Sequence, residues 1–275
     1  MQSLWVNKEY STISELSFMN IALLGAGNVA WHLAQALQAA GHTLTAVYSR
    51  TLAHAQELTQ VLPQAAPTQS LDFRTIVADV ILMAVPDAAI SGVAAALQVK
   101  PGTIVAHTSG SQPMAVLQTI AGASAGVFYP LQTFSKQVPV DFQQVPVLVE
   151  GSLEETTIAL EQLAQSISRQ VERVTSDKRK QLHLAAVFAC NFTNHLLGLS
   201  QQLLQEANLP TNLLQPLIRE TIAKASKHHP FSVQTGPAVR HDQNVLDEHL
   251  RLLQASPHLQ DIYKLLTQSI QHSKL

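Results

Sequence analysis

Residues 20–30 read NIALLGAGNVA, an apolar run that stops at a Gly-Ala-Gly turn. The run predicts a buried strand, and the apolar spacing of the residues after it predicts a helix that ends at Gly41. Gly25, Gly27 and Ala30 fit the pattern GxGxxA, whose small residues permit a tight turn, backbone contact with a pyrophosphate and close packing of helix on strand. The stretch therefore predicts a dinucleotide-binding unit, and the alternative is a glycine turn without a ligand.

The residues expected to hold the dinucleotide surround this turn. A pyrophosphate binds the free N–H groups at the start of a helix, where the helix dipole favours negative charge. The expected contacts are Gly25, Ala26, Gly27, Asn28 and Val29.

The end of the second expected strand, residues 43–50, indicates which dinucleotide is bound. Residues 48–51 read YSRT and contain no carboxylate, the group that binds the ribose 2′-OH of NAD. Arg50 can bind a 2′-phosphate through two parallel hydrogen bonds, and Ser49 and Thr51 add hydroxyl donors. We therefore expect NADP rather than NAD, and the alternative is that Arg50 is a solvated arginine at a strand end.

Strands and helices alternate through the first half of the chain, which predicts a mostly parallel sheet. The further strands are expected within residues 78–87, 102–110, 125–130 and 145–150, and the further helices within 51–60, 88–98 and 153–167. After this, residues 177–207 predict one long amphipathic helix, and residues 212–228, 245–256 and 259–270 predict three more. We expect an α/β fold with a Rossmann-like domain over residues 1–175 and an all-helical domain over residues 176–275.

The amino-acid composition and net charge limit which classes of protein this chain can belong to. Of 275 residues, 46% are hydrophobic and 13% charged, so a sizeable core is available. A net charge of −2 gives no electrostatic reason to expect nucleic acid or an anionic membrane as a partner. We expect no membrane span, no secretory signal in the first twenty residues and a cytoplasmic location. The single cysteine, Cys190, lies in the apolar stretch LAAVFACNF and is expected to be buried.

Polar residues follow several of the expected strands, where ligands bind in an open parallel sheet. Val85 and Pro86 come after one strand, beside the expected dinucleotide path, although Pro86 can equally start a helix. His107 and Ser109 follow the next strand, near the expected position of a nicotinamide ring. His107 and Tyr129 are the obvious proton carriers, and the alternative for His107 is a structural hydrogen bond.

The helical half supplies further candidates. Asn191 lies among apolar residues of the long helix, and a half-buried amide there needs a partner, either the substrate or the backbone. Arg240 lies in the stretch TGPAVRHD, where it can hold a carboxylate or phosphate, or form a salt bridge within the helical domain. Asp242 ends that stretch and is expected to cap the following helix.

Other catalytic chemistries find no support. His228 and His229 are adjacent, and neighbours on a helix do not face one another. The chain contains no HExxH motif and no metal-ligating Cys/His spacing, so no metal site is expected. Residues 122–126, GASAG, have the GxSxG spacing, but they open an expected strand and do not join a strand to a helix, so serine hydrolysis is not expected.

From Met19 onward the chain resembles a family of bacterial Rossmann-like proteins whose second half is domain of unknown function 2520. The stretches that carry the resemblance are, in order, LLGAGNVAWHLA, HTSG, YPLQTF, HLAAVFACNFTNHL, PLIRETIAKA and TGPAVRHD. The family is similar in outline to pyrroline-5-carboxylate reductases, deazaflavin-dependent NADP reductases and the 6-phosphogluconate dehydrogenase superfamily. That similarity implies a helical C-terminal domain that pairs two subunits and helps enclose the active site. Members of the family tend to have histidine at the position of Tyr129. The unperturbed pKa of tyrosine is about 10, compared with 6.5 for histidine, so Tyr129 does not suit the role of a general base.

The favoured hypothesis is an NADP-dependent oxidoreductase that transfers a hydride to or from a small polar substrate. His107, Ser109, Asn191 and Arg240 are its expected substrate-site residues, and the expected partners are that substrate and a second copy of the chain. A second hypothesis is an NADP-binding sensor or scaffold dimer without turnover. A third is a Rossmann domain for another nucleotide, such as a deazaflavin or an adenine nucleotide.

Overall fold

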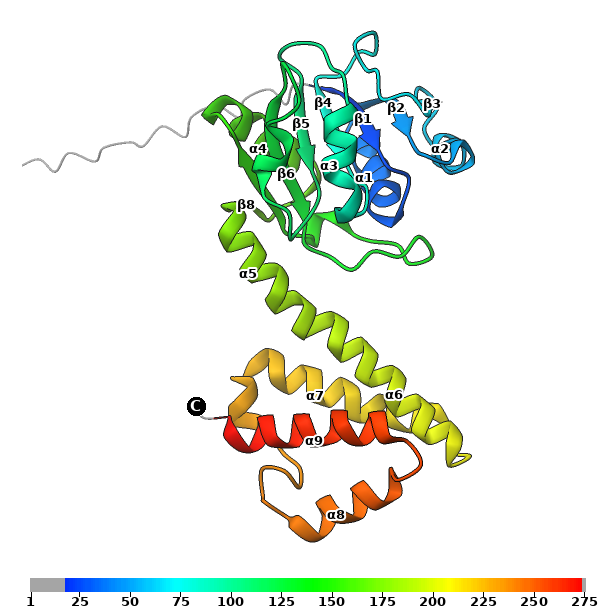
Figure 1. Ribbon diagram of the computed structural model, residues 1–275, viewed down its shortest axis with the longest axis vertical. Coiled ribbons are helices and arrows are strands. Elements are labelled where there is room, and N and C mark those ends of the chain that lie inside the picture. The colour runs from blue at the N-terminus through cyan, green and yellow to red at the C-terminus, as the bar shows by residue number, and fades with distance from the viewer. Residues whose placement is uncertain (1–17, 274–275) are drawn as a thin grey trace, which may run out of the picture. The chain divides into compact units, whose positions relative to one another are not determined.

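The computed structural model describes residues 18–273, so the expected roles of the first seventeen residues lie outside it. The chain divides into two compact units, Met1–Asn194 and His195–Leu275. Figure 1 shows that all the strands belong to the first unit. The last of them ends at Arg173 and the long helix starts at Ser176, so the change from mixed to purely helical structure precedes the division between the units.

One eight-stranded sheet forms the centre of the first unit, in the order β3-β2-β1-β4-β5-β6-β7-β8. All neighbouring pairs are parallel except β6 and β7, which confirms a mostly parallel Rossmann-like sheet. The strands are β1 Asn20–Leu24, β2 Thr43–Tyr48, β3 Ala66–Thr68, β4 Val80–Met83, β5 Ile104–His107, β6 Ser124–Pro130, β7 Val147–Gly151 and β8 Val171–Arg173. The sequence analysis missed β3 and β8, because three residues are too few to show a strand pattern.

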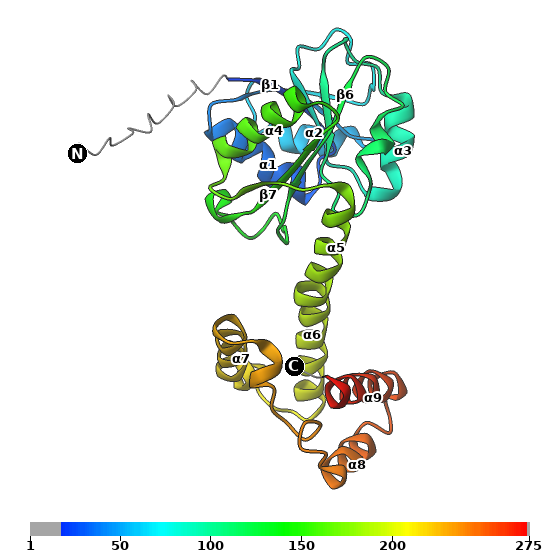
Figure 2. The ribbon, with the colours of Figure 1, turned by 90° about the vertical axis from the view of Figure 1, so that its left-hand side faces the viewer.

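Helices cover both faces of this sheet. They are α1 Asn28–Ala39, α2 Leu52–Thr59, α3 Asp87–Ala96 and α4 Glu154–Ile167. Figure 2 shows α1 and α4 on one face and α3 on the other. Successive residues of a central strand enter opposite cores: Ile21 and Leu23 pack with α1 and α4, whereas Ala22 and Leu24 pack with α3. The strands are therefore buried on both faces, which is why they read as continuous apolar runs.

The predicted long helix runs from Ser176 to Glu206 without a break in helical structure. It consists of α5 Ser176–Ala186, a π-helical segment at Val187–Phe192 and α6 Thr193–Glu206. By length and composition this helix could cross a membrane, and its most apolar 18-residue window has a mean hydropathy of 1.2 with no residue buried. Cys190 is exposed, so the expectation that it is buried was wrong: its apolar neighbours on the helix are themselves uncovered.

The second unit contains the predicted helices α7 Gln215–Lys227, α8 Gln243–Leu252 and α9 Pro257–His272. Among its described residues, the buried side chains are Ala238, Leu246 and Leu259. Asp242 occupies the N-cap position of α8, but its carboxylate accepts no backbone N–H, contrary to expectation. Its backbone ψ of 82° lies outside the extended geometry that lets a capping side chain reach the first turn.

Candidate functional site

A cavity of about 410 Å³ lies where the strand order of the sheet reverses. The chain moves outward from β1 to β2 and β3, then returns to place β4 on the other side of β1. Open α/β sheets bind ligands at such a point, beyond the carboxyl ends of the strands. The predicted cofactor residues that line the cavity are Gly25, Ala26, Gly27, Ser49, Arg50, Thr51, Val85 and Pro86.

The two glycines of the turn differ in what surrounds them, and the difference fits a bound pyrophosphate. Gly25 has φ +115°, and a Cβ there would lie 2.2 Å from the Ala84 carbonyl oxygen. Any larger residue at position 25 would therefore push β1 and β4 apart. At Gly27 a Cβ would meet nothing within 4 Å. Gly27 thus leaves open space at the start of α1, where a side chain would occupy the room that a phosphate needs.

The start of α1 has donors for an anion. Gly27 is the N-cap residue and no side chain caps the helix, so the first N–H groups are free to bind a ligand. Asn28 and Val29 are the first residues of α1 and are not among the cavity-lining residues. The Asn28 side chain donates to the Phe134 carbonyl at 3.1 Å, so it holds the β6–β7 loop and leaves its backbone N–H for a ligand.

Two cationic side chains, Arg50 and Lys136, line this cavity. Arg50 follows β2 and lines the cavity together with His54, Glu57 and Lys136. Within residues 18–273 the Arg50 guanidinium forms no ion pair, whereas the Lys136 ammonium lies 2.9 Å from a Glu57 carboxylate oxygen. An unpaired arginine at this position supports recognition of a ribose phosphate.

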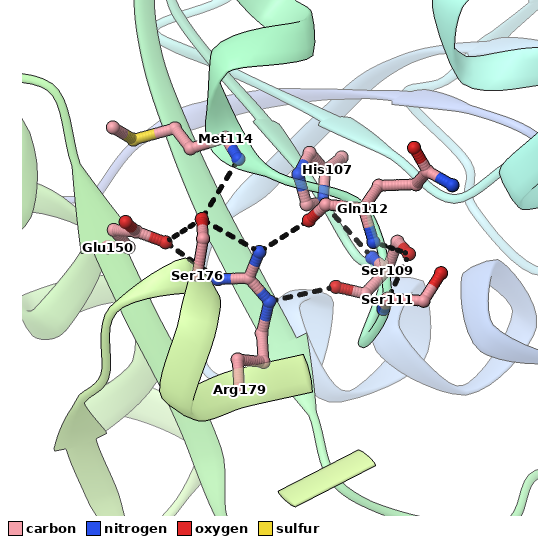
Figure 3. Close-up of polar contacts among 8 residues, drawn as sticks. All are labelled: His107, Ser109, Ser111, Gln112, Met114, Glu150, Ser176 and Arg179. Carbon is pink, nitrogen blue, oxygen red and sulfur yellow. Dashed lines mark hydrogen bonds and ion pairs between the residues drawn. The ribbon is translucent and has the colours of Figure 1, made fainter. Parts of the chain in front are cut away.

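A second cluster lies at the ends of β5 and β7, around the buried guanidinium of Arg179 (Figure 3). Arg179 donates to the Ser109 carbonyl at 3.1 Å, to the Gln112 carbonyl at 2.6 Å and to the Glu150 carboxylate at 2.7 Å. The Ser176 hydroxyl donates to the same carboxylate and accepts the Met114 N–H. Arg179 therefore ties the start of α5 to the loop that follows β5.

His107 ends β5 and is completely buried behind this loop. Its Nδ1 accepts the Ser109 N–H at 3.2 Å, which places the proton of the neutral ring on Nε2. Nε2 itself has no hydrogen-bond partner among residues 18–273. Burial, reinforced by the nearby Arg179 charge, lowers the pKa of His107 to about 4. His107 is thus a neutral residue that shapes the loop, and its predicted contact with substrate stays a prediction.

Ser109 is also buried, and its hydroxyl oxygen organises the same loop. It accepts the backbone N–H groups of Ser111 and Gln112, at 3.1 and 3.0 Å. The Ser111 hydroxyl in turn bonds the carboxylate of Asp87, in the first turn of α3. Ser109 therefore has a structural task in addition to the substrate contact predicted for it.

Tyr129 and His183 bring two proton-carrying groups together beside this loop. The Tyr129 hydroxyl lies 3.0 Å from His183 Nδ1, and both side chains are partly buried. Burial raises the pKa of Tyr129. A Cβ on Gly110 would lie 2.5 Å from His183 Nδ1, so only glycine lets the loop approach the pair this closely. The phenol and the imidazole can pass a proton between them at the edge of the sheet where ligands bind.

The two remaining predicted residues are exposed. Asn191 lies in the π-helical segment of the long helix, a type of distortion that is frequent at functional sites. The expectation that its amide is half-buried was wrong, since Asn191 is exposed, as are Phe188 and Phe192 beside it on the helix. Arg240 lies in the second unit, in the turn at Gly236–Asp242. The roles predicted for Asn191 and Arg240 in binding substrate stay predictions.

Lys136, Arg179 and His183 were not among the residues predicted for the site. Arg179 and His183 are four residues apart on a helix and so share one face, a spacing that could have linked them. Arg179 nevertheless sits in the charged run DKRK, which reads as a solvated helix start. Lys136 lies in a loop, where no periodicity shows which side chain points inward.

Two family models match the chain. The model described as a Rossmann-like domain matches residues 8–131, and the model described as a domain of unknown function (DUF2520) matches residues 145–270. A search of the curated proteins found no match.

Several solved structures share the whole fold. A provisionally named NADP oxidoreductase from Bacteroides fragilis is 39% identical, with a TM-score of 0.85 over 94% of this chain and 100% of its own. A reductive aminase from Aspergillus terreus, solved with NADPH and ethyl levulinate, is 14% identical with a TM-score of 0.68 over 94% and 95% of the two chains. A 1-pyrroline-5-carboxylate reductase from Streptococcus pyogenes is 13% identical with a TM-score of 0.60 over 93% and 99%. At such low identities the last two show the fold alone.

Proposed function

This chain belongs to the family of Rossmann-like proteins with a C-terminal DUF2520 domain, and from that premise we propose that it is an NADP-dependent oxidoreductase acting on a small polar substrate. The observation that carries the proposal is the cavity at the strand-order reversal, with open space at Gly27 and an unpaired Arg50 on its wall. The provisional name of the 39% identical relative supports the same cofactor.

In this proposal, different residues bind the cofactor and transfer the proton. The N–H groups at the start of α1 hold the pyrophosphate, and Arg50 binds the 2′-phosphate with help from the Ser49 and Thr51 hydroxyls. The bound nicotinamide supplies or accepts the hydride. Tyr129 and His183 give a proton to the substrate when it is reduced and accept one when it is oxidised, because they are a hydrogen-bonded pair of titratable side chains next to the loop after β5.

The proposal includes a homodimer that forms through the C-terminal helices. Leu184 and Phe188 of the long helix are 59% and 62% exposed, and three buried side chains make a small core for the described part of the second unit. Helices that expose so much apolar surface gain stability by burying it against another subunit. A second copy offers the same apolar surface, and the pairing accounts for the apolar window of this helix without a membrane. We place the dimer in the cytoplasm.

Paired calorimetric titrations with NADPH and NADH test the function. We expect the wild-type protein to prefer NADPH, and Arg50→Ala to weaken NADPH binding at least about 10-fold, since hydrogen bonds to a charged group are worth about 1.5–3 kcal/mol. NADH binding should change less than about 2-fold, because NADH lacks the phosphate. Arg74→Ala is the matched control: this arginine is exposed and pairs with Asp72 outside the cavity.

Equal losses for both cofactors in Arg50→Ala would contradict the NADP assignment. Binding of neither dinucleotide by the wild-type protein would remove the basis for an oxidoreductase. If NADPH binds, a panel of imines, ketones and enols should reveal a substrate through loss of NADPH absorbance. Tight binding with no turnover across a broad panel would favour the sensor or scaffold hypothesis.

A further inference from the structure

Lys136 reaches the cofactor cavity from a part of the chain that the dinucleotide motif does not include. It lies in the loop between β6 and β7, yet it lines the same cavity as Gly25 and Arg50. Its side chain is 24% exposed, and its ammonium group lies 5.0 Å from the centre of the Trp31 ring on α1. The charge is therefore held at one place on the cavity wall.

The loop that carries Lys136 is anchored on the cofactor-binding helix. His32 Nε2 hydrogen-bonds the Ser135 carbonyl at 2.8 Å, and the Asn28 amide donates to the Phe134 carbonyl at 3.1 Å. The Phe134 ring stacks on His32, with 5.6 Å between ring centres. These contacts immediately precede Lys136 in sequence, so they fix the start of its side chain relative to α1.

The charges around Lys136 leave a place for an anion. Its partner in the structure is Glu57 of α2, whose side chain is 49% exposed and which also lines the cavity. An ion pair this exposed contributes little to stability. A role in holding α2 and the loop together therefore does not explain why Lys136 and Glu57 are paired here. The Lys136 and Glu57 charges offset each other and Arg50 remains unpaired, which leaves one net positive charge facing a phosphate monoester of about −2.

We propose that Lys136 is the second cation of the 2′-phosphate site and that Glu57 holds it in place until the phosphate arrives. The proposal rests on the proposed function and deepens it. On binding, the phosphate takes the Lys136 ammonium from Glu57, so that Lys136 and Arg50 both face the phosphate and the Glu57 carboxylate remains as a competing negative charge. Glu57 then acts as a selectivity residue: it competes with the phosphate of NADPH, whereas it can accept a hydrogen bond from the 2′-OH of NADH.

Calorimetry on the full chain tests this with four probes: NADPH, NADH, adenosine 2′,5′-bisphosphate and AMP. We expect Lys136→Gln to weaken NADPH and the bisphosphate about 10-fold, with NADH and AMP changed less than about 2-fold. Glu57→Gln should tighten NADPH binding about 3-fold or more, because the competing carboxylate is gone. Lys136→Arg keeps the charge and should retain most of the affinity. Lys100→Gln, an exposed lysine outside the cavity, is the matched control.

The outcomes separate the two proposals. If wild-type protein selects NADPH and Lys136→Gln binds it as well as Lys100→Gln does, the role of Lys136 is overturned while the proposed function stands. Equal weakening of all four probes by Lys136→Gln, or weaker NADPH binding by Glu57→Gln, would also overturn it. If wild-type protein binds neither dinucleotide, both proposals fail together.

Discussion

At the residue scale, His107 lies in an environment that disfavours its charged form. It is fully buried, its Nε2 has no partner among the described residues, and its pKa falls from 6.5 to about 4 because burial penalises the charged ring. Between these two pH values the unfolded chain binds a proton at His107 that the folded chain does not. Stability that is fully present above pH 6.5 is therefore lost as the pH falls toward 4.

The expected loss from this residue is about 3 kcal/mol over that range, since one pKa unit corresponds to about 1.4 kcal/mol. Urea unfolding at pH 7.5, 6.0 and 5.0, followed through the fluorescence of Trp31 on α1, measures about 2 kcal/mol of this loss by pH 5.0. His107→Gln should show a smaller fall in unfolding free energy with falling pH than wild-type protein. His54→Gln, at an exposed histidine, should keep the wild-type slope. Parallel curves for wild type and His107→Gln would show that the histidine is not the cause.

At the element scale, the two glycines of the turn between β1 and α1 have different roles: Gly25 is needed for folding, and Gly27 for binding the cofactor. A Cβ on Gly25 collides with the carbonyl of Ala84, the residue after β4, and its φ of +115° disfavours any other residue. Gly25→Ala should therefore cost about 3 kcal/mol or more and lower the melting temperature by roughly 10 °C. The loss should appear without any ligand.

Gly27→Ala should behave differently, because its Cβ meets no protein atom and its φ of −82° suits alanine. We expect a change in stability of about 1 kcal/mol or less, together with a loss of NADPH affinity of about 10-fold or more. Thermal melts and calorimetry on the two variants measure both effects. A Gly27→Ala protein that binds NADPH normally would show that the pyrophosphate lies elsewhere.

At the scale of the whole molecule, the uncovered apolar helices predict association. Leu184 and Phe188 lie four residues apart, so both face the same side of the long helix. In analytical ultracentrifugation without detergent at micromolar concentration, the wild-type protein should sediment with twice the 29.8 kDa mass of one chain. A Leu184→Glu, Phe188→Glu double variant should shift toward the monomer, because two buried carboxylates in each subunit would oppose the contact.

Val77→Glu is the matched control for this experiment. Val77 is 58% exposed but lies in the α/β unit and in none of its helices, so the variant should remain dimeric. A monomeric wild-type protein would refute the homodimer. A protein that requires detergent to stay in solution would instead indicate that the apolar window of the long helix meets lipid.

The main strands and helices of this protein could be predicted from local patterns in its sequence. Strands buried on both faces, helices with one apolar face and a GxGxxA turn are local patterns, so the sheet, its mostly parallel order and the long helix could be predicted. Eight of the ten predicted cofactor residues line one cavity for the same reason, since strand ends in a parallel sheet lie along one edge.

The tertiary structure alone decided which distant residues meet and which charges are buried. Lys136 joins Arg50 across 86 positions because the β6–β7 loop folds over α1, and a loop carries no periodicity that predicts this. Arg179 is buried although its neighbours in sequence are solvated charges, because its guanidinium finds two carbonyls and a carboxylate on segments far along the chain. Local sequence records the propensity of a residue for a strand, helix or turn, whereas hydrogen-bond partners and burial depend on what the rest of the chain brings alongside.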